Sequence, residues 1–407
     1  MPKLLVRDLA QVVSPAGADT PLRGRALREL KILEDGYVLC ADGEIVAVGK
    51  MADLPRLNDD AGVVEVDGRG RCAIPGLVDC HTHPAFAGDR VADFDLRAGG
   101  ASYEEIHATG GGILATVEAT RSASVDDLEA LVRRHAGWMV AHGTTTWEGK
   151  SGYGLDRDTE LASLRAVRAA GGVPTWLGAH AVPPEYDGAD AYLEFALGDV
   201  LPAAATIAEA ADIFVERGAF DAVQARRYLE ACATAGLALR LHADQFTEAG
   251  GVEVAVELRA RSVDHLEATG PGGVRLLATS DVAAVLLPVA ALVLGRPMPP
   301  ARALVDAGAI VALATDFNPG SAFSESLPLV MSLACTQLGL TPAEALAACT
   351  VNAAHVLGRA DRVGRIAPGY CADVVLLDAP DWRYVAYHLA GDVVAAVVRE
   401  GRLAWGR

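Results

Sequence analysis

The chain has 407 residues, of which 51% are hydrophobic and 22% charged, a composition typical of a globular protein and not of a disordered one. Thirty-five basic residues against 53 acidic ones give a net charge of −18, which argues against binding to nucleic-acid backbones because such binding needs basic patches. Seven scattered cysteines without a CxxC pair predict reduced thiols and a cytoplasmic protein.

Strand-like runs occupy both ends of the chain. They are KLLVRDL, YVLC, IVAVG and VVEVDG near the N-terminus, and DVVLLD and VVAAVVREGRLAW near the C-terminus. Asp42-Gly43 and Glu400-Gly401 are turn signals of the hairpin type between neighbouring runs. Two β-rich ends around a different middle predict a small composite β-sandwich domain, formed by residues 1–70 together with residues 368–407.

The middle of the chain, residues 71–367, alternates apolar runs with helix-like stretches. The runs are AIPGLVDCH, TTTWEGKS, VPTWLGAH, DIFVERG, ALRLHAD, SVDHL, VAAVLLP and IVALATDF. Apolar residues at helical spacing occur at 159–170, 222–235 and 299–307, and a glycine follows each stretch. Eight strand-like runs that alternate with helices predict an α/β fold, a parallel (β/α)8 TIM-like barrel.

A histidine pair, His81 and His83, closes the first of these runs. Residues i and i+2 of a strand face the same way, so both imidazoles can point to one side of the sheet. Two imidazoles on one face are a good start for a divalent metal site, although an HxH pair alone is a weak signal.

Four later runs also carry residues of the ligand type near their ends, namely His180, His242, His265 and Asp316. Barrel enzymes carry their chemistry at the C-terminal ends of the strands, so we expect these side chains to meet. The predicted result is a mononuclear metal site with open positions for water and substrate, formed by His81, His83, His242 and Asp316. A closed structural zinc site is the alternative, but such sites usually contain cysteine, and alternation turns Cys80 outward.

Residues 75–124, beginning PGLVDCHTHPAFAGDR, resemble the amidohydrolase superfamily and, within it, the imidazolonepropionase family. The segments EGKSGYG, LGAHAVPPEY, HADQF, ATDFNPGS and PGYCADVVLLDAPD fit the same family, and the resemblance covers nearly the whole chain. It implies hydrolysis of the ring amide of 4-imidazolone-5-propanoate to N-formimidoyl-L-glutamate, the third step of L-histidine degradation. It also implies one zinc or iron ion per subunit, held by the ligand set above, and a homodimer.

The resemblance implies a substrate site as well. Arg90 falls at the position that binds the substrate carboxylate, for which a guanidinium fork is suited. Tyr153 and His180 fall where the family contacts the imidazolone. Further implied contacts, to the product, come from Asn318, Gly320 and Ser321, in a loop that can present backbone N–H groups to a carboxylate.

The sequence also suggests roles in the reaction, in which a metal-activated water attacks the ring carbonyl. His265 is predicted to polarise that carbonyl, and Asp316 to move the water proton to the leaving nitrogen. Gln245 occupies a position where some relatives carry Glu. An amide cannot act as a general base at neutral pH, so Gln245 is expected to orient the ring or the water by hydrogen bonds.

Several alternatives remain open at this point. A deaminase of a purine, pyrimidine or related ring would use the same metal site but would not need Arg90 as a carboxylate clamp. An inactive scaffold would have lost metal ligands. Lys150 ends its run where related two-metal amidohydrolases carry a carbamylated lysine, but a mononuclear site does not need one. Surface or core roles are expected for the remaining histidines, which are His107, His135, His142, His355 and His388.

Two further expectations concern other parts of the chain. The glycines at 110–112 are candidates for a mobile lid because they lie beside the predicted site. The longest apolar run, residues 282–294, is interrupted by Pro288 and is too short to cross a membrane.

Overall fold

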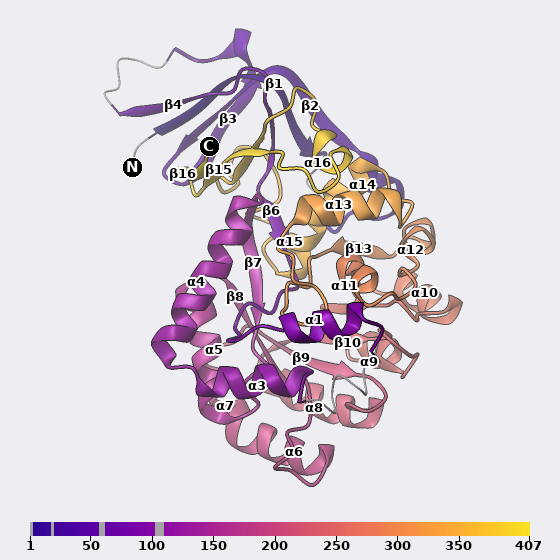
Figure 1. The fold of residues 1–407 in the computed structure, drawn as a ribbon. Coiled ribbons are helices and arrows are strands. Elements are labelled where there is room, and N and C mark those ends of the chain that lie inside the picture. The colour runs from indigo at the N-terminus through magenta and orange to yellow at the C-terminus, as the bar shows by residue number, and fades with distance from the viewer. Residues whose placement is uncertain (1–2, 18–19, 57–61, 102–109) are drawn as a thin grey trace.

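The computed structural model describes residues 3–17, 20–56, 62–101 and 110–407 (Figure 1). Its largest part is a sheet of eight strands, in the order β6-β7-β8-β9-β10-β11-β12-β13, and every ladder between neighbours is parallel. These strands are β6 (Leu77–Asp79), β7 (Thr144–Lys150), β8 (Val173–Ala179), β9 (Ala210–Val215), β10 (Ala238–Ala243), β11 (Ser262–His265), β12 (Ala283–Leu286) and β13 (Ile310–Leu313). The predicted barrel is confirmed.

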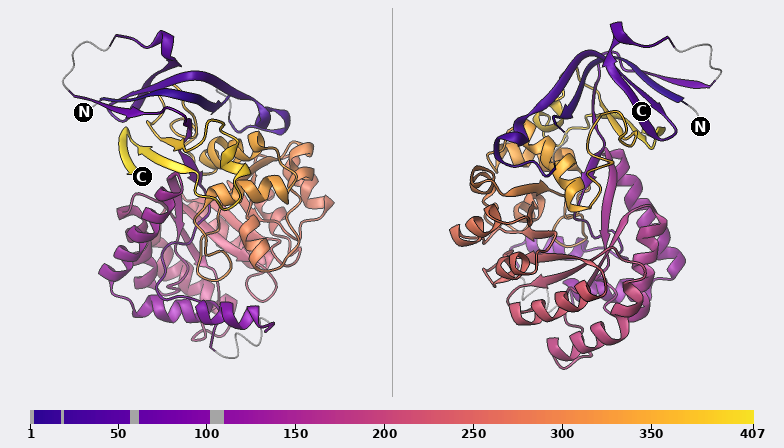
Figure 2. Two further views of the ribbon diagram at one scale, coloured as in Figure 1. Left: turned by 45° about the horizontal axis from the view of Figure 1, so that its top comes forward. Right: turned by 180° about the vertical axis from the view of Figure 1, so that it is seen from behind.

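Helices connect these strands and surround the sheet (Figures 1 and 2). The three helices predicted from apolar spacing are α5 (Arg157–Ala169), α8 (Ala222–Thr234) and α12 (Ala301–Ala307). The remaining helices are α1 (Val91–Ala98), α3 (Ile113–Ser122), α4 (Val125–Ala141), α6 (Ala189–Phe195), α7 (Leu201–Ala204), α9 (Gly251–Glu257), α10 (Pro271–Ala278), α11 (Pro288–Val293), α13 (Leu327–Thr336), α14 (Pro342–Ala347), α15 (Ala353–Val356) and α16 (Tyr384–Tyr387), with short 3-10 segments η1 (Gly24–Arg28) and η2 (Met51–Asp53) and π segments η3 (Ala196–Val200) and η4 (Ala348–Asn352). None of the helices in the described ranges is long and apolar enough to span a bilayer.

The two ends of the chain form a second sheet, which lies at one end of the barrel in Figures 1 and 2. Its path is β16-β15-β14-β5-β1-β2-β3, with β4 paired in parallel to β1. The strands are β1 (Lys3–Pro15), β2 (Leu30–Ala41), β3 (Glu44–Lys50), β4 (Val63–Asp67), β5 (Cys72–Pro75), β14 (Val374–Leu377), β15 (Val394–Arg399) and β16 (Arg402–Gly406). The composite origin from both termini is confirmed, although the strands join in one mixed sheet where two facing sheets were expected.

Both predicted hairpin turns are present in this sheet. Asp42 and Gly43 have φ values of 52° and 82°, and Glu400 and Gly401 have φ values of 49° and 71°. Consecutive residues with positive φ match the turn type that preserves the twist of paired antiparallel strands.

The first apolar run, AIPGLVDCH, contributes one strand to each of the two sheets. Its first part is β5, which pairs with β1 and β14, and its second part is β6, which begins the barrel. Gly76 separates the two, and a Cβ there would lie 2.2 Å from Oγ1 of Thr145. The close approach of the chain to β7 therefore requires glycine at this point. The proposed boundary between the domains, near residue 71, stays a prediction.

The junction that closes the barrel, between β6 and β13, differs from the other junctions between neighbouring strands. No ladder joins β6 to β13 among the described residues; instead, Thr82 forms an isolated bridge with Phe317 just beyond the strand ends. The Thr315 hydroxyl and backbone N–H donate to the buried Asp79 carboxylate at 2.6 and 3.1 Å. We call this junction the seam.

Candidate active site

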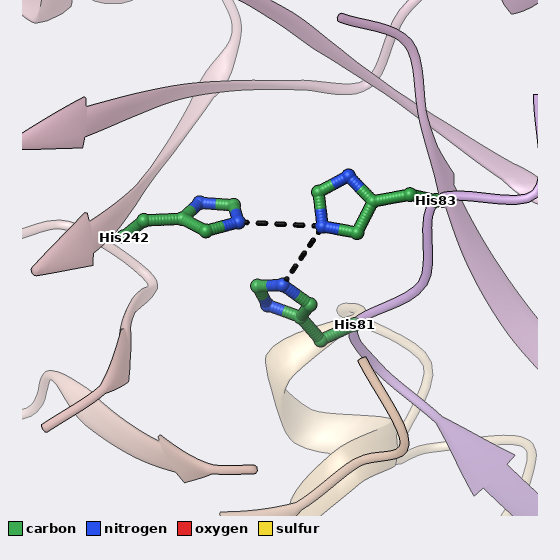
Figure 3. A group of neighbouring side chains, drawn as sticks. All are labelled: His81, His83 and His242. Carbon is green, nitrogen blue, oxygen red and sulfur yellow. Dashed lines mark hydrogen bonds between the residues drawn. The ribbon is translucent and has the colours of Figure 1, made fainter. Parts of the chain in front are cut away.

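Three imidazoles meet where the barrel strands end (Figure 3). His81 and His83 follow β6, and His242 lies on β10. The Nε2 atom of His83 is 3.2 Å from Nε2 of His81 and 3.3 Å from Nε2 of His242. Oδ1 of Asp316, beyond β13, lies 3.4 Å from Nε2 of His81 and 3.3 Å from Nε2 of His83. All four predicted ligands are therefore brought together, and all four are buried.

The geometry and chemistry of this cluster fit a divalent cation. Donors at ~2.0–2.1 Å from a tetrahedral ion are about 3.3 Å apart, close to the separations of the Nε2 atoms. Two of the three outer ring nitrogens have carboxylate partners: Nδ1 of His81 is 2.6 Å from Asp264, and Nδ1 of His242 is 3.0 Å from Asp212. A carboxylate on Nδ1 fixes the tautomer that leaves Nε2 free to bind a metal.

The electrostatics of the cluster favour the ligand forms of two side chains. Burial by itself would raise the pKa of Asp316, but hydrogen bonds with His81 and His83 outweigh it, and the pKa lies well below the usual range. Burial holds the pKa of His83 well below its ordinary value. An ionised carboxylate and a neutral imidazole are the forms that bind metals.

His265 ends β11 beside the cluster. Its ring centre lies 5.7 Å from that of His81 and 5.3 Å from that of His242, and its φ is 84°. Nδ1 is 3.4 Å from Oε1 of Glu267. His265 with His81 and Asp316 forms a second group whose potential ligand atoms lie within 4.8 Å of one another. The side chain is thus close enough to act on a reacting group, while its predicted role stays a prediction.

Tyr153 and His180 form one wall beside His83. The His180 ring lies 5.5 Å from that of His83, nearly parallel to it, and 5.3 Å from that of Tyr153. Nδ1 of His180 is 3.0 Å from the carbonyl oxygen of Gly152, which can only accept, so this nitrogen carries the proton and Nε2 is left as an acceptor. Burial, followed by the charge on His242, lowers the pKa of His180 to about 3.

A residue without a predicted role, Glu160, holds the loop that carries Tyr153. Oε1 of Glu160 accepts backbone N–H bonds from Gly152, Gly154 and Leu155 at 2.9, 2.9 and 3.0 Å. The same loop supplies the Gly152 carbonyl that sets the His180 tautomer. Glu160 lies six residues after the segment EGKSGYG, and the sequence gave no signal for this contact.

Arg90 is held on two sides of its guanidinium. Nε donates to Oγ1 of Thr116 and Nη1 donates to Oδ2 of Asp93, each at 3.0 Å. The same Asp93 oxygen accepts the N–H of Gly112 at 2.9 Å, which ties the glycine-rich segment to the arginine. A Cβ on Gly320 would lie 3.1 Å from Nη2 of Arg90, so the predicted carboxylate clamp and the predicted product loop are in contact.

The loop after Asp316 is organised by Asn318. Its Oδ1 accepts the N–H groups of Gly320 and Ser321 at 2.8 and 2.7 Å, and its Nδ2 donates to the Asp316 carbonyl at 2.6 Å. Two amides that we expected to face a carboxylate therefore donate within the loop, because the short Asn side chain reaches them first. Contacts of Asn318, Gly320 and Ser321 with a ligand stay a prediction.

The structure gives less information about the roles of the remaining residues that the sequence singled out. Gln245 is buried in the segment after β10, and its predicted role stays a prediction. Nδ1 of the buried His135 donates to the Pro84 carbonyl at 2.8 Å, as expected of a core histidine. His107 lies outside the described residues, whereas Gly110, Gly111 and Gly112 lie within them, and their role as a mobile lid stays a prediction. Lys150 is fully buried in ion pairs with Glu148 and Asp212, and its expected lack of a metal-bridging role stays a prediction.

Comparison with known proteins agrees with this geometry. The model of the amidohydrolase family matches residues 72–404. The chain is 61% identical to an imidazolonepropionase of Rubrobacter xylanophilus, over 98% of both chains, and 46% identical to one of Chloroflexus aggregans, again over 98% of both. The chain belongs to the imidazolonepropionases of the amidohydrolase family.

Solved structures with the same fold are more distant in sequence. An Escherichia coli guanine deaminase superposes with a TM-score of 0.76 at 14% identity, covering 100% of this chain and 99% of its own. A Xanthomonas campestris adenosine deaminase with bound zinc superposes with a TM-score of 0.71 at 20% identity, covering 98% and 92%. At such low identity these matches establish the fold alone.

Proposed function

We propose that the protein hydrolyses the ring amide of 4-imidazolone-5-propanoate to N-formimidoyl-L-glutamate. The observation that carries the proposal is the convergence of His81, His83, His242 and Asp316 at the mouth of a barrel whose sequence is 61% identical to an imidazolonepropionase. An inactive scaffold is disfavoured because all four predicted ligands are present and face one another.

The metal is proposed to be one zinc or iron ion per subunit, bound by these four side chains. When bound, such an ion lowers the pKa of a coordinated water and so makes a nucleophile available at neutral pH. Imidazole suits both zinc and iron, so the donor set accommodates either.

The following roles in binding and catalysis are proposed for the protein's own residues. The Arg90 guanidinium binds the propionate, and Tyr153 and His180 contact the ring. His265 polarises the ring carbonyl, on whose oxygen negative charge develops. Asp316 accepts the proton of the attacking water at its carboxylate and delivers it to the ring nitrogen that leaves. Gln245 orients the ring or the water.

The test is an assay of metal-loaded protein on freshly generated 4-imidazolone-5-propanoate, followed by the loss of its ultraviolet absorbance. His242→Ala is expected to abolish turnover, and His142→Ala, which removes a half-exposed imidazole paired with Glu325, serves as the matched control. Guanine and adenosine are assayed in parallel. Metal-loaded protein that leaves the imidazolone intact but releases ammonia from either purine would overturn the proposal in favour of a deaminase.

The protein is further proposed to act as a cytoplasmic homodimer. All seven cysteines are free thiols, five of them buried, which fits a reducing compartment. Sedimentation of the purified protein would give the subunit number, and a monomer at all concentrations would contradict the dimer.

A further inference from the structure

Five charged side chains fill the barrel interior beneath the metal-ligand cluster. They come from β7, β9, β10 and β11, each is at most 2% exposed, and we call them the ion cluster: Glu148, Lys150, Asp212, Arg240 and Asp264. Nζ of Lys150 lies 2.7 Å from Asp212, 2.9 Å from Glu148 and 3.8 Å from Asp264. Nη1 of Arg240 donates to Glu148 at 2.8 Å. A single ammonium group thus contacts three carboxylates.

Two of these carboxylates are also the partners of metal-ligand histidines. Asp212 is 3.0 Å from Nδ1 of His242, and Asp264 is 2.6 Å from Nδ1 of His81. Lys150 is therefore linked to both histidines through these two carboxylates. Its place between Asp212 and Asp264 allows two like charges to stay close in a dry interior, where their repulsion would otherwise be strong.

The carboxylates of this region outnumber its lysine and arginine side chains. With Asp316, the ion cluster contains four carboxylates and two cationic side chains, which leaves two negative charges. One divalent ion among neutral imidazoles would balance them. Burial alone would lower the pKa of Lys150, but Asp212, Glu148 and Asp264 outweigh it and raise the pKa, so the ammonium stays charged.

We propose that Lys150 is a positioning residue that holds Asp212 and Asp264 in place, and through them orients His242 and His81 for metal binding. This inference rests on the proposed metal-dependent function. Without the ammonium, the two carboxylates would repel each other and would no longer hold the His81 and His242 rings in one orientation. Loss of such outer partners commonly weakens metal binding by about 10–100-fold.

The test measures zinc affinity of the metal-free full-length protein by competition with a chromophoric chelator. Lys150→Met is expected to weaken zinc binding by about 10–100-fold. Arg302→Met is the matched control, because it also removes a cation from a buried carboxylate, Glu344 at 3.0 Å, without any contact to the ligands. Circular dichroism confirms that each variant is folded. Unchanged zinc affinity in folded Lys150→Met would overturn the proposal.

A combined variant keeps the test decisive if Lys150→Met does not fold. Lys150→Met is added to a protein in which both partner carboxylates are neutral, Asp212→Asn with Asp264→Asn, and zinc affinity is compared with that of these two substitutions alone. If Lys150 acts through the two carboxylates, adding Lys150→Met costs clearly less than tenfold in zinc affinity. A further loss of tenfold or more would show that Lys150 acts by another route and would overturn the proposal.

Substrate turnover separates this inference from the proposed function. At saturating metal, Lys150→Met is expected to lower kcat and leave KM for the substrate unchanged, because Lys150 lies below the ligands and away from Arg90. The zinc measurement needs no substrate. Failure of the imidazolone assay in the native protein would therefore leave the positioning role of Lys150 testable on its own.

Discussion

At Gly320 the absence of a side chain has a specific consequence for Arg90. A Cβ at this position would lie 3.1 Å from Nη2, closer than such contacts normally allow. The rest of the loop cannot shift easily to make room, since Asn318 accepts its N–H groups. Glycine therefore allows the guanidinium to rest against the loop.

We expect Gly320→Ala to displace the Arg90 guanidinium and raise KM for the imidazolone by about tenfold, equivalent to ~1.4 kcal/mol of lost binding, with little change in kcat. Steady-state kinetics at saturating metal would measure both constants. Gly137→Ala in α4 is the matched control, because a Cβ there meets nothing within 4 Å. An unchanged KM in Gly320→Ala would show that Arg90 does not need this contact to bind substrate.

The convergence of the four candidate ligands could be predicted from sequence, and the residues that support them could not. His81 and His83 are two positions apart, and the other ligands lie near the ends of recognisable apolar runs, so local spacing was informative. The carboxylate on His81 is Asp264, 183 residues away, and no pattern in the sequence links them. Likewise, Lys150 meets Asp212 only because β7 and β9 face the same barrel interior.

Among the elements, α14 shows how a helix start joins distant segments. Thr341 and Glu344 form a capping box, and the Glu344 carboxylate also receives Arg28 of η1 at 2.9 Å and Arg302 of α12 at 3.0 Å. Burial would raise the pKa of Glu344, but the Thr341 N–H and the two guanidinium groups outweigh it and lower the pKa. The folded protein therefore favours the ionised carboxylate.

The sign of this shift gives a pH prediction. A carboxyl group with a lowered pKa in the folded state stabilises the fold above its unfolded pKa of about 4.3, and this stabilisation is lost as the pH falls through the folded pKa. We expect Glu344→Gln to lower Tm at pH 7, and the difference from the native protein to shrink below about pH 4.3. Calorimetry at pH 7 and pH 3.5 would measure it. A Tm difference of equal size at both values would contradict an ionic contribution.

The elements themselves were largely predictable, with one instructive exception. Eight apolar runs and three helical patterns matched observed strands and helices because their periodicity follows from burial on one face. The pattern of the run that divides into β5 and β6 predicts one strand, since both halves are apolar. Only the contact of Gly76 with Thr145 reveals the change of sheet, and that contact depends on the tertiary fold.

At the scale of the whole molecule, Asn352 connects the N-terminal segment to the barrel. Its Oδ1 accepts the Leu22 N–H at 2.8 Å, and its Nδ2 donates to the carbonyls of Leu22 and Val311 at 2.9 and 2.8 Å. Asn352 is fully buried, so no solvent can replace these bonds. One amide thus joins three regions of the chain.

Asn352→Ala is expected to destabilise the protein by at least ~2 kcal/mol, because unpaired buried backbone groups cost about 1–3 kcal/mol each. Chemical denaturation followed by circular dichroism would give the change in unfolding free energy. Thr234→Ala, which removes an exposed hydroxyl bonded within its own helix, should change stability by less than about 0.5 kcal/mol. Equal effects of the two substitutions would show that Asn352 has no special role.

Because the candidate ligands lie on both sides of the seam, a bound metal ion would also affect how fast the barrel opens there. Among the described strands, β6 and β13 are the barrel neighbours without a ladder, and His81 and His83 lie on one side of this junction while Asp316 lies on the other. An ion bound to all three would cross-link the two sides. Its removal should then speed amide hydrogen exchange first at Leu77–Asp79 and Ile310–Leu313, well before exchange at the central strands rises. The lifetime of the closed barrel would then depend on how long the ion stays bound.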